Sequence, residues 1–310
     1  MMRQASPPIS LTRIERKLIR RSYQHCQQLT KRCAANFYYG MRLLNKAQAS
    51  AMYSMYAWMR LADDIADHPE LSYNQKIEYL ATLKKDTLRY VYHPPSWETL
   101  FEQDPLWPAV VTTIQQYAIP LSYFEDLLQG LLMDQEKHHY ASFVELEEYC
   151  YRVASVVGLI CLEIWGYRDD KTAKQLAIWQ GIAFQLTNII RDIFVDAQMG
   201  RLYLPAEDFN CESLTAEQFL QLDYEQQCEG VEIIIERALS YFRKSARLER
   251  CISPTSRKCL RVMSTIYQSL LAKLIKNKQK LLKHQKHIQV HPLAKLWIVL
   301  SQKNDSYWDE

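Results

Sequence analysis

The chain has 310 residues, of which 48% are hydrophobic and 24% are charged, as is usual for a soluble globular protein. Its seven glycines are dispersed, so neither a P-loop nor a dinucleotide-binding glycine fingerprint is present. If the protein binds phosphate, it must therefore use side chains and metal ions. The formal net charge of +3 conceals a basic segment from Arg250 to Lys303, which has twelve Lys or Arg residues and no Asp or Glu.

The basic segment has several interpretations. A cationic stretch can bind nucleic acid, an anionic membrane surface or a diphosphate substrate, and it can equally be a solvated helix face. Its most basic part, Lys273 to Lys286, contains no aromatic residue, which argues against nucleic acid. We expect no nucleic-acid partner and keep peripheral contact with a membrane surface as a hypothesis.

Cysteines and apolar runs bear on the cellular compartment. The eight cysteines are scattered without a Cys-x-x-Cys pair, which is typical of reduced intracellular thiols. The N-terminal residues have no apolar signal-peptide core, and the apolar run from Leu296 to Leu300 is far too short to span a bilayer. We therefore expect a cytoplasmic protein.

In chain order, apolar residues recur at helical spacing through nearly the whole sequence, and no alternating strand pattern is present. Breaks rich in proline, glycine or small polar residues separate the periodic stretches, at 68–74, 93–96, 105–108, 120, 200–205 and 253–254. The pattern predicts an all-α, single-domain helical bundle. We expect an N-terminal extension with the start of the first helix at 1–22, the helical domain at 23–300, and a tail at 301–310.

The first informative helix covers Ala49 to Ala66 and is apolar around most of its circumference, which is typical of the middle of a bundle. Near its end, four polar residues share one face or its edge: Arg60, Asp63, Asp64 and Asp67. Carboxylates so close together repel one another and need cations. A solvated acidic turn before Pro69 is the alternative explanation.

A second apolar helix, Leu176 to Val195, carries a matching polar stripe. Its members follow one another at spacings of three and four residues, with Arg191 beside them: Gln185, Asn188, Asp192 and Asp196. Side-chain oxygens of this kind suit a hard cation such as Mg²⁺, which shares its ligands with phosphate. Two such stripes on separate helices predict the facing halves of a metal–diphosphate site.

Three ordered motifs resemble the squalene/phytoene synthase family. The stretch from Asn36 to Asp67, which ends in Asp-Asp-x-x-Asp, is similar to the family's first signature. Gln185 to Pro205, with Asn-x-x-Arg-Asp-x-x-x-Asp followed by Arg-x-Tyr-x-Pro, is similar to the second. Tyr149 to Gly158 resembles the central helix, and Asp134 lies where the family also has an acidic residue. The similarity covers about Tyr23 to Leu300.

The resemblance implies an isoprenoid-synthase bundle with a deep, central apolar channel, in which Mg²⁺, or alternatively Mn²⁺, bridges two diphosphates. It implies that metal is held at one diphosphate by Asp63, Asp64 and Asp67, and at the other by Asn188, Asp192 and Asp196. It also implies residues that contact diphosphate or shape its pocket, namely Arg60, Arg191, Gln185, Tyr149, Arg201, Tyr203 and Tyr267. Three small residues would let a prenyl chain lie against the central helix: Ala154, Val157 and Gly158.

The activity that the resemblance implies is the head-to-head condensation of two allylic isoprenoid diphosphates. Loss of one diphosphate gives an allylic cation, which the double bond of the second substrate attacks; loss of a proton then closes the ring of a cyclopropylcarbinyl diphosphate. Asn36-Phe37 and Ala62 to Asp67 resemble bacterial hydroxysqualene synthases, whereas Tyr149 to Leu159 resembles phytoene and presqualene diphosphate synthases equally. The resemblance favours farnesyl-derived C30 products, with geranylgeranyl diphosphate and C40 phytoene as the alternative. NADPH is not expected, because no dinucleotide fingerprint is present. Other enzymes of the same pathway are the further partners that this activity suggests.

Several positions depart from the family's pattern. Cys33 and Asn36 stand where some relatives have His and Ser, Ala49 replaces a frequent basic residue, and Asn45 replaces a proline. Two more stand where arginines are common: His287 and Gln289. These changes concern details of diphosphate binding and leave the six predicted metal ligands in place.

Two other classes of function compete with the enzyme. A family member that has lost catalysis could act as an assembly factor, but it should lose its aspartates first, and all five are present. A helical protein that binds membranes or nucleic acid through the basic segment is the other. His138 and His139, beside Asp134 and Glu136, fit a hydrophilic helix end better than a transition-metal site.

Overall fold

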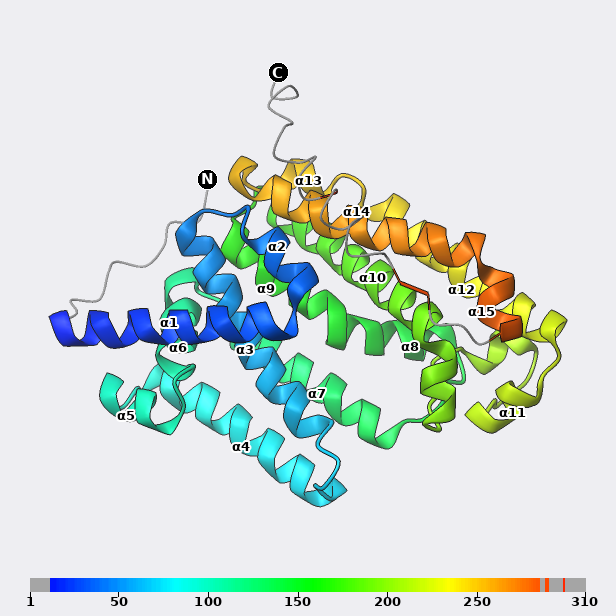
Figure 1. Cartoon of the computed structure of the whole chain (residues 1–310), viewed down its shortest axis with the longest axis horizontal. Helices are drawn as coiled ribbons and strands as arrows, with labels where there is room; N and C mark the ends of the chain where they lie inside the picture. Colours follow the sequence, from blue (N-terminus) through cyan, green and yellow to red (C-terminus); the bar gives the residue numbers. More distant parts are fainter. Residues whose placement is uncertain (1–11, 285–287, 290–297, 299–310) are drawn as a thin grey trace. The chain divides into compact units, whose positions relative to one another are not determined.

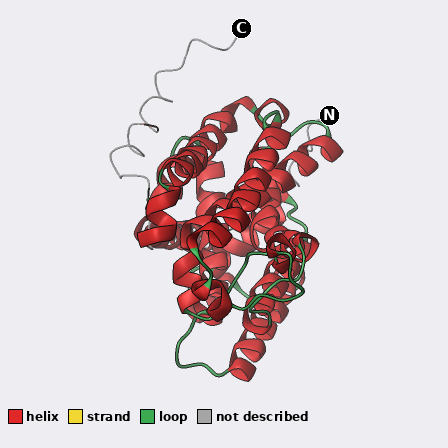
Figure 2. Cartoon of the chain, turned by 90° about the vertical axis from the view of Figure 1, so that its right-hand side faces the viewer, coloured by secondary structure: helices red, strands yellow, loops and turns green. Residues whose placement is uncertain are grey.

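The computed structural model describes residues 12–284, 288, 289 and 298. These residues form helices, turns and loops and contain no β-strand, as Figure 2 shows with the helices in red. Strand-like backbone pairing is confined there to two isolated bridges, Tyr140 with Pro205 and Tyr167 with Ile252. The predicted all-α class is confirmed. None of the helices in this part of the chain has the length and apolar character needed to cross a membrane.

The described residues divide into two compact units. One consists of 12–132, 159–173 and 251–260, and the other of the remaining described residues. Figure 1 labels the helices and colours them along the sequence. Five helices begin in one unit and end in the other, namely α7 (Leu121–Glu136), α9 (Val156–Trp165), α10 (Asp170–Gln198), α13 (Leu248–Cys251) and α14 (Pro254–Lys276).

The first unit also contains α1 (Arg13–Cys33), α2 (Ala35–Met41), α3 (Lys46–Ala66), α4 (Tyr73–Tyr92), α5 (Trp97–Gln103) and α6 (Trp107–Tyr117). Polar side chains cap the starts of several of these helices. Asn45, for example, accepts a hydrogen bond from the amide of Gln48 at 2.9 Å and so begins α3. Such a cap satisfies an amide that the first helical turn leaves without an intrahelical partner.

The core of the first unit lies where α1, α3 and α6 pack together. The hydroxyl of Thr113 on α6 bonds Tyr23 of α1 at 2.9 Å and Ser54 of α3 at 2.8 Å. The indole of Trp58 on α3 is fully buried and donates to Thr87 on α4 at 3.0 Å. These bonds fix the rotation of α3 and therefore the direction in which its last turn presents its side chains.

The second unit also contains α8 (Phe143–Cys150), α11 (Ala216–Gln221), α12 (Tyr224–Ser245) and α15 (Lys278–His284), with a π-helical turn η1 (Tyr151–Ser155) and a 3-10 turn η2 (Ala206–Phe209). Its apolar core includes one face of α10, on which Ile182, Leu186 and Ile190 are 1% exposed or less. The spacing of four residues aligns these side chains, and the predicted polar stripe lies beside them on the same helix.

The π-helical turn approaches α10 at very short range. A Cβ atom on Gly181 would lie 2.4 Å from the Cα atom of Ser155, and one on Gly158 would lie 3.2 Å from the carbonyl oxygen of Ala177. The hydroxyl of Ser155 donates to the carbonyl of Ile178 at 2.8 Å. Glycine at position 181 is therefore required for the close contact between these two segments.

Each predicted break coincides, to within two residues, with a boundary between observed helices. The structure adds boundaries that were not predicted, at 34, 42–45, 137–142, 166–169, 210–215, 222–223, 246–247 and 277. Caps such as Asn45 and Ser142, rather than proline, start the helices that follow two of them. The domain boundaries expected near residues 22 and 300 stay predictions, and the second lies outside the described residues.

Candidate functional site

The first polar stripe lies at the end of α3, in the first unit. Asp63 is half-buried, whereas Asp64 and Asp67 are exposed. Arg60 forms an ion pair with Asp64, with 2.5 Å between Nη2 and Oδ1. The Nε atom of Arg60 is buried and has no hydrogen-bond partner among the described residues. A cationic donor beside the carboxylates is therefore available to an anionic ligand.

Cys33 and Tyr56 adjoin this stripe. The pKa of Tyr56 is raised by burial first, and then by Cys33, Asp63 and Asp64, against the opposing charge of Arg60. Tyr56 is therefore a neutral hydroxyl beside the acidic group at physiological pH. Cys33 is exposed at the last turn of α1.

The second polar stripe lies along α10 in the second unit, and its members are half-buried: Gln185, Asn188, Asp192 and Asp196. Arg191 binds Asp192 through two contacts, Nε to Oδ1 at 2.7 Å and Nη2 to Oδ2 at 2.5 Å. Asn188 donates to Gln185 at 3.4 Å. The side-chain oxygen of Asn188 is buried and accepts no hydrogen bond from the described residues, which leaves it free to bind a donor or a cation.

Asp196 lies among other carboxylates. Its pKa is raised to about 7, first by burial and then by the charges of Asp192 and Asp134, against Arg201 and Arg191. Neighbouring carboxylates disfavour one another's ionised form, and a bound positive charge would restore it. The end of α10 therefore favours binding of a cation.

The segment that follows α10 folds back onto the stripe. The amide of Arg201 donates to the carbonyl of Asp196 at 2.9 Å, and its guanidinium lies 3.9 Å from a carboxylate oxygen of Asp134. Tyr203 donates to the other oxygen of Asp134 at 2.7 Å. Backbone bonds of 2.8 Å join this segment to the chain before α8, from Leu202 to His138 and from Ala206 to Tyr140.

Tyr203 of this segment stacks with two other tyrosines. The rings of Tyr149 and Tyr203 have centroids 5.2 Å apart, and those of Tyr140 and Tyr203 are 5.9 Å apart. Burial raises the pKa of all three hydroxyls, so they are neutral at physiological pH. The hydroxyl of Tyr140 is buried without a hydrogen-bond partner in the described part of the chain.

Tyr267 on α14 also lies beside the second stripe. Its ring stacks on Phe184 of α10, with centroids 4.0 Å apart and planes 7° from parallel. Burial raises the pKa of Tyr267, while a hydrogen bond with Asn188 and the charge of Arg191 oppose the shift. The structure thus brings a tyrosine from α14 to the residues that the second motif supplies.

The three predicted small residues, Ala154, Val157 and Gly158, are half-buried on η1 and α9. Gly158 has a packing reason to be small, because its missing Cβ atom faces the carbonyl of Ala177. Contact of these residues with a prenyl chain stays a prediction.

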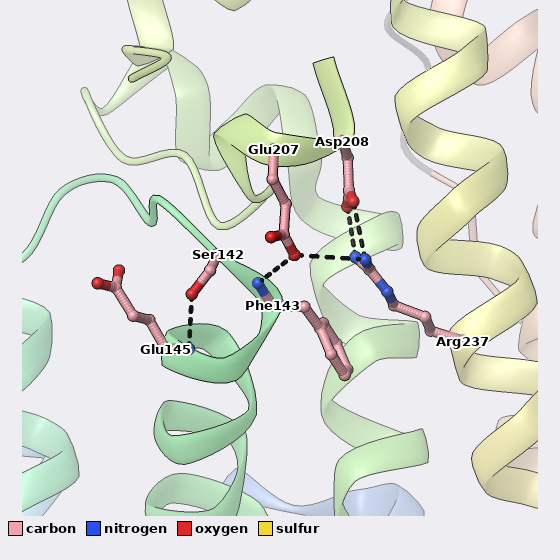
Figure 3. A network of polar contacts seen from close by, with 6 residues as sticks. All are labelled: Ser142, Phe143, Glu145, Glu207, Asp208 and Arg237. Atoms are coloured by element: carbon pink, nitrogen blue, oxygen red, sulfur yellow. Dashed lines mark hydrogen bonds and ion pairs between the residues drawn. The ribbon is translucent and has the colours of Figure 1, made fainter. Parts of the chain in front are cut away.

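A polar network surrounds η2, as Figure 3 shows, and no sequence motif indicated it. Arg237 of α12 binds both carboxylate oxygens of Asp208, with one contact of 2.8 Å, and lies 3.6 Å from Glu207. Glu207 accepts a hydrogen bond from the amide of Phe143 at 2.7 Å. The guanidinium carbon of Arg237 also lies 4.2 Å from the centroid of the Phe143 ring.

This network anchors the segment that carries Arg201 and Tyr203. The side chain of Asp208 is only 4% exposed, and burial raises its pKa against the opposing effect of Arg237. The acidic pair after Pro205 was visible in the sequence. Its partner Arg237, however, is 29 residues away from Asp208, so no local spacing could identify it.

The structure therefore brings predicted residues together within each unit: Arg60 with Asp64 near the end of α3, and the α10 stripe with Arg201, Tyr203 and Tyr267. Tyr149 stacks on Tyr203. The facing arrangement of the two stripes stays a prediction. Ala49 is buried in α3. The side chain of Asn36 and the whole of His287 lie outside the described residues, and the carbonyl of Gln289 accepts a bond from Lys273 at 2.5 Å.

Within the described residues, no group of three or more His, Cys, Asp or Glu side chains is placed to hold a metal ion unaided. His138 and His139 are exposed. Mg²⁺ is usually bound by one or two carboxylates together with water and substrate phosphate, not by a protein cage. The unpaired oxygen of Asn188 and the carboxylates of Asp192 and Asp196 fit such a shared site.

Comparison with known sequences gives one family. The model of the squalene/phytoene synthase family matches residues 30–293. A phytoene synthase of Arthrospira platensis is 30% identical over 273 residues, which cover 83% of this chain and 84% of the relative. A 15-cis-phytoene synthase of Synechococcus elongatus is 30% identical over 281 residues, covering 81% and 82% of the two chains.

Comparison with solved structures confirms the fold. A dehydrosqualene synthase in complex with ligand superposes with a TM-score of 0.76 at 24% identity, covering 93% of this chain and 98% of that one. The squalene synthase HpnC from Alicyclobacillus acidocaldarius superposes with a TM-score of 0.74 at 24% identity, covering 84% and 95%.

Proposed function

We propose that this chain, which belongs to the squalene/phytoene synthase family, condenses two allylic isoprenoid diphosphates head to head and requires Mg²⁺ to do so. The observation that carries the proposal is the oxygen cluster on α10, where Asn188 has an unpaired buried oxygen and the pKa of Asp196 is raised to about 7. A bound cation would coordinate the Asn188 oxygen and would favour the ionised form of Asp196.

Each stripe has a stated role in this proposal. Metal at one diphosphate would be held by Asp63, Asp64 and Asp67, and metal at the other by Asn188, Asp192 and Asp196. Bound Mg²⁺ would supply Lewis-acid stabilisation of the charge on the departing diphosphate. Arg60 and Arg191 donate hydrogen bonds to the diphosphate oxygens while negative charge develops on them. Gln185 and Arg201 add further polar side chains to the pocket around the diphosphates.

The allylic cation that remains after diphosphate loss must be kept from water. The neutral, stacked rings of Tyr149 and Tyr203, and of Phe184 and Tyr267, present apolar faces beside the second stripe. Such faces attract a cation through the ring quadrupole without offering it a nucleophile. The hydroxyl of Tyr203 is engaged by Asp134, which reduces its availability to react.

The length of the prenyl chain is the finer part of the proposal. The two relatives at 30% identity are phytoene synthases that align over more than 80% of this chain, which favours geranylgeranyl diphosphate and a C40 product. The resemblance of Asn36-Phe37 to bacterial hydroxysqualene synthases favours farnesyl diphosphate and a C30 product. We take the C40 reaction as the first candidate, because the relatives support it over most of the sequence.

The test is incubation of the purified chain with geranylgeranyl or farnesyl diphosphate, with Mg²⁺ or with EDTA, and without NADPH. Lipid products are identified by mass spectrometry, and released diphosphate is quantified. The variants Asp64→Asn and Asp192→Asn should each lower turnover by about 100-fold or more, as expected when a catalytic metal is lost. Glu212→Gln, which removes an exposed carboxylate between η2 and α11, should leave turnover unchanged.

A C40 hydrocarbon from the first substrate establishes phytoene synthesis, whereas a C30 alcohol or cyclopropyl diphosphate from the second establishes the squalene branch. Turnover that is equal in Mg²⁺ and EDTA contradicts the metal requirement. Folded protein that releases no diphosphate from either substrate contradicts the enzyme and favours a non-catalytic member of the family.

A further inference from the structure

A cleft of about 480 Å³ in the first unit is lined by α1 and the start of α3. Its α1 side consists of residues one helical turn apart, including Arg16, Arg20 and Gln24, and its α3 side consists of Lys46 and Ser50. Lys46 lies about 25 Å along α3 from Asp63, at 1.5 Å per residue. The cleft is therefore separate from the first aspartate stripe.

The cleft is positively charged without any local compensation. Arg16, Arg20 and Lys46 are exposed, no acidic residue lines the cleft, and none of the three forms an ion pair with a described residue. Arg16 and Arg20 are four residues apart on one helix, where like charges destabilise each other. An anion between them would reverse that penalty.

The acidic residue nearest in sequence is already committed elsewhere. Glu15 accepts a hydrogen bond from the backbone amide of Thr12 at 2.6 Å as part of a capping box at the start of α1. The sequence before Thr12 contains no Asp or Glu, so it offers no carboxylate to the cleft either.

The remaining lining suits a small polar head group. Ser50 and Gln24 offer uncharged donors beside the cations. Tyr23 has its hydroxyl bonded to Thr113 at 2.9 Å, and Ile19 is buried, so these two provide the inner, apolar part of the lining. The first turn of α3 adds the positive end of its helix dipole.

We propose that this cleft binds a phosphate-bearing ligand through Arg16, Arg20 and Lys46, independently of the aspartate stripes. Phosphate matches the bidentate donor geometry of arginine and the point charge of lysine. A soluble phosphate or diphosphate and the phosphate head group of an anionic lipid share this chemistry, and the experiment distinguishes them.

The full chain is tested in EDTA, which prevents cation-dependent binding at the aspartates. Inorganic diphosphate is titrated by calorimetry, and co-sedimentation is measured with phosphatidylcholine vesicles with and without phosphatidic acid. The paired variant Arg20→Gln/Lys46→Gln is compared with Arg13→Gln/Lys17→Gln, which removes the same charge outside the cleft. All four side chains are exposed, and circular dichroism and Tm verify folding.

The cleft variant should weaken binding of the probe by about tenfold or more, since it removes two charge-assisted contacts, whereas the control should change it by less than about twofold. If inorganic diphosphate binds, and the cleft variant weakens that binding while the control does not, the site takes a soluble phosphate. If the chain instead sediments only with vesicles that contain phosphatidic acid, with the same difference between the variants, the site takes a lipid head group. Equal weakening in both variants, or no binding of either probe to the unmodified chain, overturns the proposal.

Discussion

The hydroxyl of Tyr203 donates a hydrogen bond of 2.7 Å to Asp134, a residue 69 positions earlier in the chain. The bond ties the segment after α10 to the end of α7. The same carboxylate lies 3.9 Å from the guanidinium of Arg201, and its charge contributes to the raised pKa of Asp196. Asp134 therefore links the Arg-x-Tyr-x-Pro segment after α10 to the carboxylates of that helix.

We expect Tyr203→Phe to lower the free energy of unfolding by about 2 kcal/mol, because it removes a hydrogen bond to a half-buried carboxylate. Tyr140→Phe is the matched control. It removes a buried hydroxyl that has no partner among the described residues, so it should be neutral or slightly stabilising. Urea unfolding of both variants measures the difference, and equal losses would contradict the assigned role of the Tyr203 hydroxyl.

A second prediction concerns the ion pair between Arg237 and Asp208 (Figure 3). Arg237→Gln leaves the carboxylate of Asp208 buried without its cation, which should cost about 3–5 kcal/mol. Arg243→Gln removes an exposed arginine from the same helix and should cost less than about 0.5 kcal/mol.

The double variant Asp208→Asn/Arg237→Gln separates the pair from its neighbours. The double variant should lose less free energy of unfolding than the single variants Asp208→Asn and Arg237→Gln lose together, by about 1–3 kcal/mol, since both partners of one interaction are then gone. Strict additivity in a denaturant series would show that the two residues act independently.

The raised pKa of Asp196 predicts a pH dependence of stability. The folded-state value of about 7 exceeds the ordinary value of 3.8, so the folded protein binds the proton more tightly than the unfolded chain does. The stabilising contribution is complete below about pH 4 and is lost as the pH rises through about 7. In EDTA at pH 8, Asp196→Asn should therefore be more stable than the unmodified chain by about 1–2 kcal/mol, after solvent screening.

Thermal unfolding from pH 4 to pH 8 in EDTA measures this effect. Glu212→Gln, at an exposed position, should follow the unmodified chain throughout. Added Mg²⁺ should remove the advantage of Asp196→Asn, because a bound cation favours the ionised carboxylate. A variant whose stability parallels the unmodified chain at every pH would contradict the raised pKa.

The close contact between η1 and α10 predicts a large effect of a single methyl group. Gly181→Ala would place its Cβ atom 2.4 Å from the Cα of Ser155, so backbone must move, and we expect a loss of about 3 kcal/mol or more. Gly158→Ala meets the Ala177 carbonyl oxygen at 3.2 Å and should cost about 1 kcal/mol. Chemical denaturation ranks the two, and the reverse order would contradict this packing.

Much of the fold followed from the sequence because helical periodicity and proline are local signals. The breaks at 93–96 and 120 were predicted from proline, which cannot continue a helix. The boundary at 42–45 was not predicted, because it depends on the cap that Asn45 forms with Gln48. The π-helical turn η1 was also missed, since its geometry depends on how Ser155 packs against Gly181.

The features of the candidate site were likewise predicted from the sequence only in part. By itself, the sequence identified the residue types and helical spacing of both carboxylate stripes, because i, i+3 and i+4 positions of one helix share a face whatever surrounds them. Only the tertiary structure showed that Tyr203 bonds Asp134 and that Arg237 neutralises Asp208. These partners are distant in the chain, and packing of whole helices, which no local pattern encodes, brings them within hydrogen-bond range.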